Sequence, residues 1–266
     1  MNYQQAVDYL KNSLIYQMSL GSKELFHSNV WWWLIENDKN FIKAFIPDFN
    51  LKDYSGGGFI EPEREEKNRD ILIWLEKNHG EKAHVVIENK IKTLPTLEQL
   101  KNYTVNLGNS LFQYGVLTGI GLCPLDLSKL VGVNDTNGNW SYTSYDQISS
   151  TIRLIACDSQ SPVIRSRLEQ IQEYCEIIEA LNFIIKENIS VYEKIFTYKN
   201  LGGLDELRIT DVFKKHKGSQ FLNYVKDRKA EIERYTPNGY QSIIDQSFHN
   251  GKTTLDVRFS NKSSDD

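Results

Sequence analysis

Residues 69–91, RDILIWLEKNHGEKAHVVIENKI, decide the fold of this chain. Their two halves, residues 69–76 and 83–91, are rich in the β-branched, aromatic and other apolar residues that fit a half-buried pleated surface. Between the halves, Asn78-His79-Gly80 supplies residues that favour a tight turn. The stretch therefore predicts two central strands that pair in an antiparallel hairpin.

Three charged residues interrupt these apolar strands: Asp70 begins the first strand, and Glu88 and Lys90 lie near the end of the second. Residues two apart in a strand point to the same face, so Glu88 and Lys90 project together while Asn89 points away. Charge buried in an apolar strand costs several kcal/mol unless a partner or a metal compensates it. The alternative interpretation is a surface salt bridge, which is the more common setting of an acid–lysine pair.

If Asp70 lies at a similar height on the neighbouring strand, its carboxylate and that of Glu88 form an oxygen-ligand site suited to Mg²⁺ or Mn²⁺. Such a cation polarises a phosphoryl oxygen and lowers the pKa of a bound water. Lys90 would orient that water or neutralise the charge that builds on the phosphate in the transition state. The segment therefore predicts metal-dependent hydrolysis of a phosphodiester.

Asp70 followed by Glu88-Asn89-Lys90 resembles the signature of the PD-(D/E)XK nuclease superfamily, an acidic residue, a spacer and then (D/E)-x-K on a paired strand. The proline that precedes the first acid in the family is replaced here by Arg69, which weakens the motif without touching its ligands. The resemblance implies that Asp70 and Glu88 hold the metal, that the backbone carbonyl of Asn89 also faces it, and that Lys90 serves the nucleophile.

Gln99 and Tyr103 form Q-x-x-x-Y on the predicted helix after the second strand, which resembles the RecB-like exonuclease branch of that superfamily. There this helix faces the active site and contacts the substrate phosphate. A four-residue spacing puts both side chains on one helix face. The alternative is that they form only the polar edge of an amphipathic helix.

Glu24-Leu25-Phe26-His27-Ser28 resembles the E-x-x-H-S segment of an uncharacterised bacterial group in the same superfamily, where an acid on this helix often supplies another metal or water contact. Glu24 is otherwise an acid favoured by the helix dipole, and we interpret His27 as a structural histidine. That group also tends to show W-x-S-Y-x-x-I, which Trp140-Ser141-Tyr142 leading into Tyr145 and Ile148 resembles, so the resemblance spans roughly residues 22 to 185.

Apolar periodicity outside residues 69–91 predicts the remaining elements. It indicates helices over residues 3–19, 24–46, 95–107 and 163–187, with Thr96 as an N-cap and Gly108 as a stop signal. Residues 112–120 predict a buried strand, residues 152–157 a strand or a short helix, and residues 241–260 a hairpin. Residues 47–62, with Gly56-Gly57-Gly58, indicate an irregular connection and a candidate lid.

Composition excludes several classes of protein. An apolar fraction of 40% with 12% aromatic residues is typical of a globular protein. The three cysteines form no C-x-x-C pair, which argues against a disulfide framework or a structural zinc site. No leader pattern and no long apolar run occur, so we expect a cytoplasmic protein with no membrane association.

The net charge of −4 does not favour non-specific binding to nucleic acid. A local basic strip can coexist with an acidic total. Lys214-Lys215-His216-Lys217, together with Lys226, Arg228 and Lys229, forms either such a strip or a solvated helix face.

Together these patterns predict an α/β protein with a restriction-endonuclease-like mixed sheet, helices on both faces, and two regions. Residues 1–188 are the nuclease-like domain, and residues 189–266 are a mainly helical extension of unassigned role that packs on the core. By resemblance, the activity is Mg²⁺- or Mn²⁺-dependent hydrolysis, with DNA favoured over RNA, in defence, restriction or repair. The proposed site residues are Asp70, Glu88, Lys90, Glu24, Gln99 and Tyr103.

Two alternatives stay open at this point: a nuclease that cleaves RNA, and a non-catalytic module for nucleic-acid binding or assembly that retains the fold. The intact set of Asp70, Glu88 and Lys90 argues against the second, because a degenerate site is free to lose one of them. Many members of the superfamily act as dimers, so a homodimer is compatible with the resemblance, although no two-fold surface is identifiable in the sequence.

Overall fold

A computed structural model describes residues 1–19, 24–54, 58–91, 95–121, 123, 125, 127–130, 139–189, 207–210, 212, 218, 221, 224–249 and 252–261. The chain forms two compact units. The first comprises Met1–Ile91 and Pro95–Lys186, and the second includes Glu187–Asp266. The proposed site residues all belong to the first unit. None of the described helices is long and apolar enough to cross a membrane.

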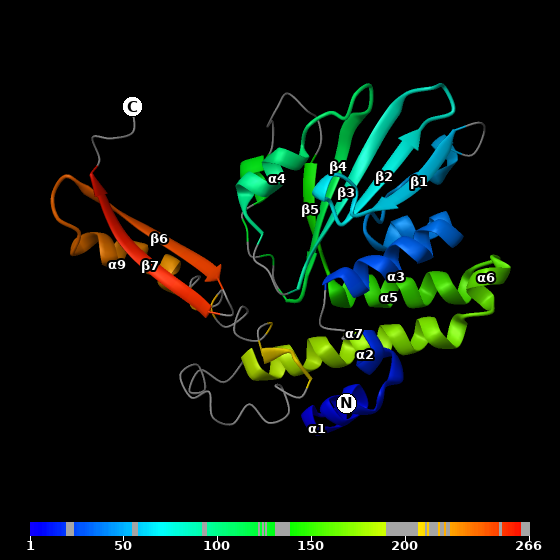
Figure 1. Cartoon of the computed structure of the whole chain (residues 1–266). Helices are drawn as coiled ribbons and strands as arrows, with labels where there is room; N and C mark the ends of the chain where they lie inside the picture. The colour runs from blue at the N-terminus through cyan, green and yellow to red at the C-terminus, as the bar shows by residue number, and fades with distance from the viewer. Residues whose placement is uncertain are drawn as a thin grey trace. The chain divides into compact units, whose positions relative to one another are not determined.

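The first unit is built on a five-stranded mixed sheet with the order β1-β2-β3-β4-β5 (Figure 1). β1, β2 and β3 pair in antiparallel fashion, whereas β3 with β4 and β4 with β5 are parallel. The strands are β1 (Phe59–Arg64), β2 (Ile71–Glu76), β3 (Lys82–Lys90), β4 (Leu111–Gly119) and β5 (Asn139–Ser144). The predicted hairpin of residues 69–91 is therefore the pair β2 and β3 at the middle of the sheet.

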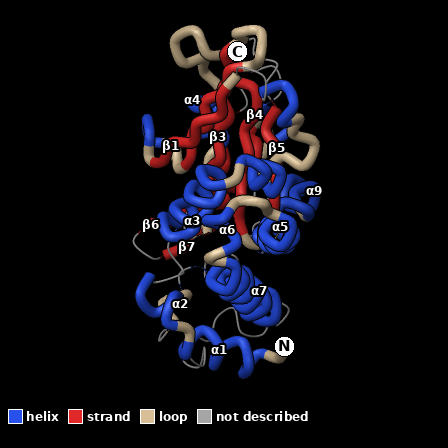
Figure 2. The backbone as a smooth tube through the Cα atoms, turned by 90° about the vertical axis from the view of Figure 1, so that its right-hand side faces the viewer, coloured by secondary structure: helices blue, strands red, loops and turns tan. Residues whose placement is uncertain are grey.

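Helices cover both faces of this sheet. On one face, Leu100 and Tyr103 of α4 (Leu97–Tyr103) share a buried cluster with Leu72, Val86 and Leu117. Neighbouring residues of β3 point to the opposite face, which α3 (Glu24–Asn37) contacts. There α3 and α5 (Tyr145–Asp158) lie side by side, with Trp31 against Tyr145 (Figure 2). The expectation of a mixed sheet flanked by helices is confirmed.

The remaining elements of the first unit are helices. The α-helices are α1 (Tyr3–Asn12), α2 (Leu14–Ser19), α6 (Pro162–Arg165) and α7 (Leu168–Ile189), and the 3₁₀ helices are η1 (Lys39–Ala44), η2 (Leu51–Tyr54), η3 (Glu66–Asn68) and η4 (Leu127–Leu130). The predicted helix over 24–46 is split into α3 and η1. Its break occurs at Asp38, whose side chain accepts a hydrogen bond from the Asn40 backbone N–H.

Three sequence-based assignments need correction or completion. Residues 59–62 are not an irregular connection, since they belong to β1, and residues 55–57 of the proposed lid lie outside the described residues. Pro62 hid this strand, but β1 is an edge strand, where a residue without an N–H is tolerated. Residues 152–157 are helical, within α5, which starts with a capping box between Ser144 and Gln147.

The described part of the second unit contains a short helix, α9 (Lys229–Arg234), and a hairpin of β6 (Tyr240–His249) and β7 (Lys252–Asn261). The two strands pair antiparallel over their full length, from Tyr240 opposite Asn261 to His249 opposite Lys252. The hairpin predicted at residues 241–260 is therefore confirmed.

Candidate nuclease site

The register of β2 and β3 brings two carboxylates together. Ile71 pairs with Ile87, so the next residues outward, Asp70 and Glu88, lie opposite each other. Residues directly opposite on paired strands project from the same face of a sheet. Asp70 is further held by its Oδ2, which accepts a hydrogen bond of 2.7 Å from the Asn89 backbone N–H. The two acids, expected at a similar height on neighbouring strands, therefore lie on one face of the sheet, the face that α4 covers.

Glu88 is the more buried acid of this pair, with 2% of its surface exposed. Its Oε1 lies 2.6 Å from Lys90 Nζ and accepts a hydrogen bond of 2.8 Å from Gln99 Nε2. Its Oε2 is also buried but finds no hydrogen-bond partner among the residues that the structure describes. A buried carboxylate oxygen without a donor is costly, and such an atom calls for an explanation such as a bound ion.

The pKa values of the three charged groups follow from this enclosure. Burial, and then the nearby Asp70, raise the pKa of Glu88 to about 7. Burial also raises the pKa of Asp70, although the Asn89 N–H and Lys90 oppose the change. Burial lowers the pKa of Lys90, but the Glu88 carboxylate outweighs it and the net pKa is raised. Lys90 is therefore a cation at neutral pH, which suits a charge-neutralising role rather than that of a base.

Gln99 and Tyr103 are connected to the carboxylates rather than directed only to solvent. Gln99 Nε2 donates to Tyr103 Oη at 3.0 Å as well as to Glu88. Tyr103 Oη donates in turn to the Asn68 carbonyl at 2.6 Å. The helix that carries them starts where the sequence predicts, because Thr96 caps it by accepting from the Gln99 N–H.

Arg69, noted from the sequence only as a departure from the family pattern, lies beside this network. Its side chain is 5% exposed, and its guanidinium carbon is 4.9 Å from the centre of the Tyr103 ring. A planar cation over an aromatic face is an attractive arrangement. Its isolated position before Asp70 gave no sequence signal for this contact.

Glu24 contributes to the site from α3. Its Oε1 accepts a hydrogen bond of 2.8 Å from the Ile91 backbone N–H, just after Lys90. Its negative charge also adds to the rise in the pKa values of Asp70 and Glu88. His27 is fully buried and its Nδ1 lies 3.0 Å from Tyr174 Oη, in agreement with a structural histidine.

The Asn89 side chain joins the sheet to α3 on the opposite face. Its Nδ2 donates to the Glu24 carbonyl at 2.8 Å and to Ser28 Oγ at 3.1 Å. Its Oδ1 accepts from Tyr145 Oη. The middle residue of Glu88-Asn89-Lys90 thus fixes the start of α3 relative to the site, a role that sequence reasoning missed because its partners are far away along the chain.

Replacing Asn89 by alanine is expected to lower the free energy of unfolding by about 2–4 kcal/mol, because it removes the hydrogen bonds that join β3 to α3 and takes the Asn89 acceptor away from the buried Tyr145 hydroxyl of α5. The measurement is the urea midpoint at constant m-value. Asn12→Ala is the control, since Asn12 makes a surface hydrogen bond to the Asp8 carbonyl on α1. Equal stability of the two variants would contradict the anchoring role.

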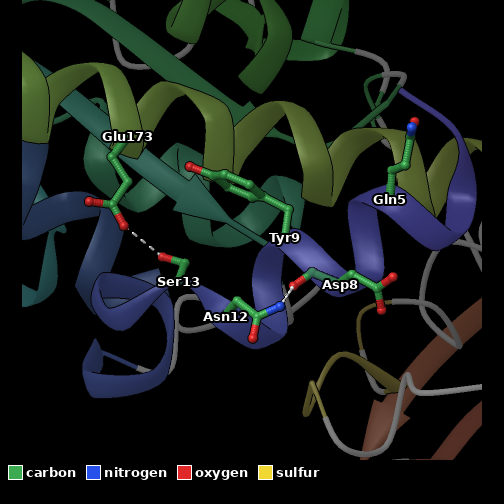
Figure 3. Close-up of a pocket in the computed structure, with 6 residues that line it drawn as sticks. All are labelled: Gln5, Asp8, Tyr9, Asn12, Ser13 and Glu173. Carbon is green, nitrogen blue, oxygen red and sulfur yellow. Dashed lines mark hydrogen bonds between the residues drawn. The ribbon is translucent and has the colours of Figure 1, made fainter.

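Other polar clusters of the described residues fit a phosphodiester site less well. A hollow between α1 and α7 is lined by Gln5, Asp8, Tyr9, Asn12, Ser13 and Glu173, with Ser13 Oγ donating to Glu173 (Figure 3). It contains acids but no cation that would attract a phosphate. Residues 214–217 of the basic strip considered from the sequence lie outside the described residues. Of the others, Arg228 stacks on Tyr224, with its guanidinium carbon 3.6 Å from the ring centre.

Comparison with known proteins agrees with this geometry. Residues 14–177 match the family model of the PD-(D/E)XK nuclease superfamily. The chain belongs to this superfamily. No curated protein and no solved structure matches it significantly. The superfamily assignment covers all strands of the five-stranded sheet and every proposed site residue, and the α/β core is accordingly restriction-endonuclease-like.

Proposed function

We propose that this member of the PD-(D/E)XK superfamily is a divalent-metal-dependent nuclease that hydrolyses phosphodiester bonds in DNA. The observation that carries the proposal is the buried Oε2 of Glu88, which has no donor among the described residues and belongs to the acid opposite Asp70. Two facing acids beside a lysine require a compensating cation if both are ionised.

The donor set fits a hard cation such as Mg²⁺ or Mn²⁺. Asp70, Glu88 and the Asn89 carbonyl would hold it, all with oxygen atoms, as such ions prefer. Among the described residues no three His, Cys, Asp or Glu side chains form a metal-binding group, so the proposed set depends on a main-chain oxygen and on substrate or water to complete it. When bound, the cation polarises a phosphoryl oxygen and lowers the pKa of a water.

The protein's own residues supply the rest. Lys90, protonated and held by Glu88, neutralises the charge that develops on the phosphate. Gln99 donates to Glu88 Oε1 and so fixes this oxygen, which would leave Oε2 to bind the proposed ion. Glu24 keeps the end of β3 in position through the Ile91 N–H.

The proposal is tested by incubating the purified protein with plasmid, linear duplex, single-stranded DNA and RNA, with Mg²⁺, Mn²⁺ or EDTA. We expect DNA cleavage that requires the cation. Cleavage of RNA alone would make RNA the substrate instead of DNA. Cleavage that persists in EDTA would contradict the proposed metal dependence. No cleavage of any substrate with either ion would contradict the proposed function.

Gln99→Ala is expected to lower kcat/KM roughly tenfold without abolishing cleavage, because one hydrogen bond to Glu88 is lost while both carboxylates and Lys90 remain. The control is Glu98→Ala, which removes an exposed side chain from the same turn of α4. Steady-state kinetics on the best substrate decide the prediction. A Gln99 variant as inactive as one that lacks Asp70 would instead place Gln99 among the indispensable groups.

A further inference from the structure

A second hollow, of about 380 Å³, opens on the same face of the sheet as Asp70 and Glu88. It lies over β1 and β2, with the segment after α4 as its far wall. In the strand register Glu61 is opposite Trp74, and Trp74 is four residues from Asp70 along β2, so all three side chains share one face. At about 3.3 Å per residue, the hollow lies roughly 13 Å from the carboxylate pair.

The lining of this hollow combines aromatic surface with hydrogen-bonding groups. Phe59 is 42% exposed and Trp74 is half-buried. Trp74 Nε1 donates to Glu63 Oε2 at 2.8 Å, which fixes both the ring and the carboxylate and leaves Oε1 of Glu63 to accept from a ligand. Asn109 and Ser110 add polar atoms from the opposite wall. A volume of this size is within the range of small-ligand sites, roughly 300–1,000 Å³.

The charges of the lining select against a phosphate. Glu61 and Glu63 lie inside the hollow, and its lysine, Lys82, is 3.5 Å from Glu76. Carboxylates beside an aromatic ring instead fit a planar group with amino hydrogens at its edge. In nucleic acids that group is a base, since the exocyclic amine of cytosine or adenine donates to such acceptors.

We propose that this hollow binds an unpaired base that carries an exocyclic amino group, a few nucleotides from the cleaved bond. The inference rests on the proposed nuclease function and specifies its substrate. The base stacks on Trp74 and donates to Glu63, while the phosphate to be cleaved lies at Lys90. A base inside a duplex is stacked and paired, so the substrate is single-stranded or locally unpaired there.

The test uses labelled thymine oligonucleotides with one cytosine placed at successive positions, single-stranded and in duplex. With wild-type protein we expect the single strand to be cleaved faster than the duplex, and one cytosine position to raise kcat/KM roughly tenfold. Glu63→Gln should remove the preference for cytosine, so that the cytosine-containing strand and the all-thymine strand are cleaved with similar kcat/KM. Trp74→Ala should lower kcat/KM roughly tenfold for the cytosine-containing strand and for the all-thymine strand. Trp74→Phe, which retains a ring, should keep most of the wild-type kcat/KM.

The matched control is Trp32→Ala. Trp32 Nε1 donates to the Pro62 carbonyl of β1 from α3, so this variant disturbs the same strand without touching the hollow. Oligonucleotide binding in EDTA, measured by fluorescence anisotropy, gives a second reading that does not require catalysis. Cleavage with an unchanged cytosine preference in Glu63→Gln and Trp74→Ala overturns the base site and leaves the nuclease intact. If the protein cleaves nothing but binds cytosine-containing strands more tightly, and both variants lose that preference, the nuclease proposal is overturned and the base site is supported. If the protein cleaves nothing and binds all strands equally, both proposals are overturned.

Discussion

Lys90→Ala and Asp70→Ala are each expected to reduce metal-dependent cleavage by about 10²–10³-fold or more. The Lys90 side chain is 12% exposed and its Nζ lies 2.6 Å from Glu88 Oε1, so its loss removes the cation proposed to face the phosphate and also leaves Glu88 harder to ionise. Asp70 faces Glu88 across the strand pair, so its loss halves the carboxylate set proposed for the metal. Initial rates on the preferred DNA substrate measure both effects.

The matched control for the lysine is Lys39→Ala, since Lys39 forms a surface ion pair with Glu36 at 3.1 Å. Circular dichroism and the thermal midpoint show whether each variant remains folded, because both substitutions remove a partly buried charge. Folded Lys90 and Asp70 variants that cleave at the wild-type rate would place the hydrolytic centre elsewhere in the chain.

The second large effect is a pH dependence of Mg²⁺ binding. In the metal-free protein burial and Asp70 raise the pKa of Glu88 to about 7, and burial raises that of Asp70. Because the ion binds ionised carboxylates, it must displace a proton below that pH. Mg²⁺ affinity should therefore rise about tenfold per pH unit up to about pH 7 and then level off. Calorimetry in two buffers of different ionisation enthalpy counts the protons released.

The same pKa predicts how pH affects folding. A carboxyl whose pKa is higher in the folded than in the unfolded protein binds more protons when folded, so its contribution to stability is present at low pH and is lost as pH rises from about 4.5 to about 7. Bound Mg²⁺ should offset this loss of stability most strongly near pH 7, where Glu88 is most ionised. Glu88→Gln should remove most of the pH dependence of metal affinity, and an affinity that is constant from about pH 5.5 to about pH 8 would contradict the assignment of Glu88 as a ligand.

The local pattern of the sequence determined the centre of this protein. Runs of β-branched, aromatic and other apolar residues and the turn at Asn78-His79-Gly80 predicted the β2–β3 hairpin, which the strand register confirms. The period of two put Glu88 and Lys90 on one face and Asn89 on the other, where its contacts with α3 now place it. Thr96 likewise marked the start of α4. These features depend on neighbours in the chain, and short-range geometry is encoded in residue spacing.

Tertiary structure alone decided the contacts that enclose the site. Three of these contacts join residues that are far apart in the sequence. They are the stacking of the Arg69 guanidinium over the Tyr103 ring, the hydrogen bond from the Ile91 N–H to Glu24, and the hydrogen bond from the Tyr145 hydroxyl to Asn89. The edge strand β1, which contains Pro62, and the hollow beside Trp74 also depend on which elements pack together. Such contacts follow from how layers of the fold pack, and periodicity indicates which face of an element is buried but not which partner covers it.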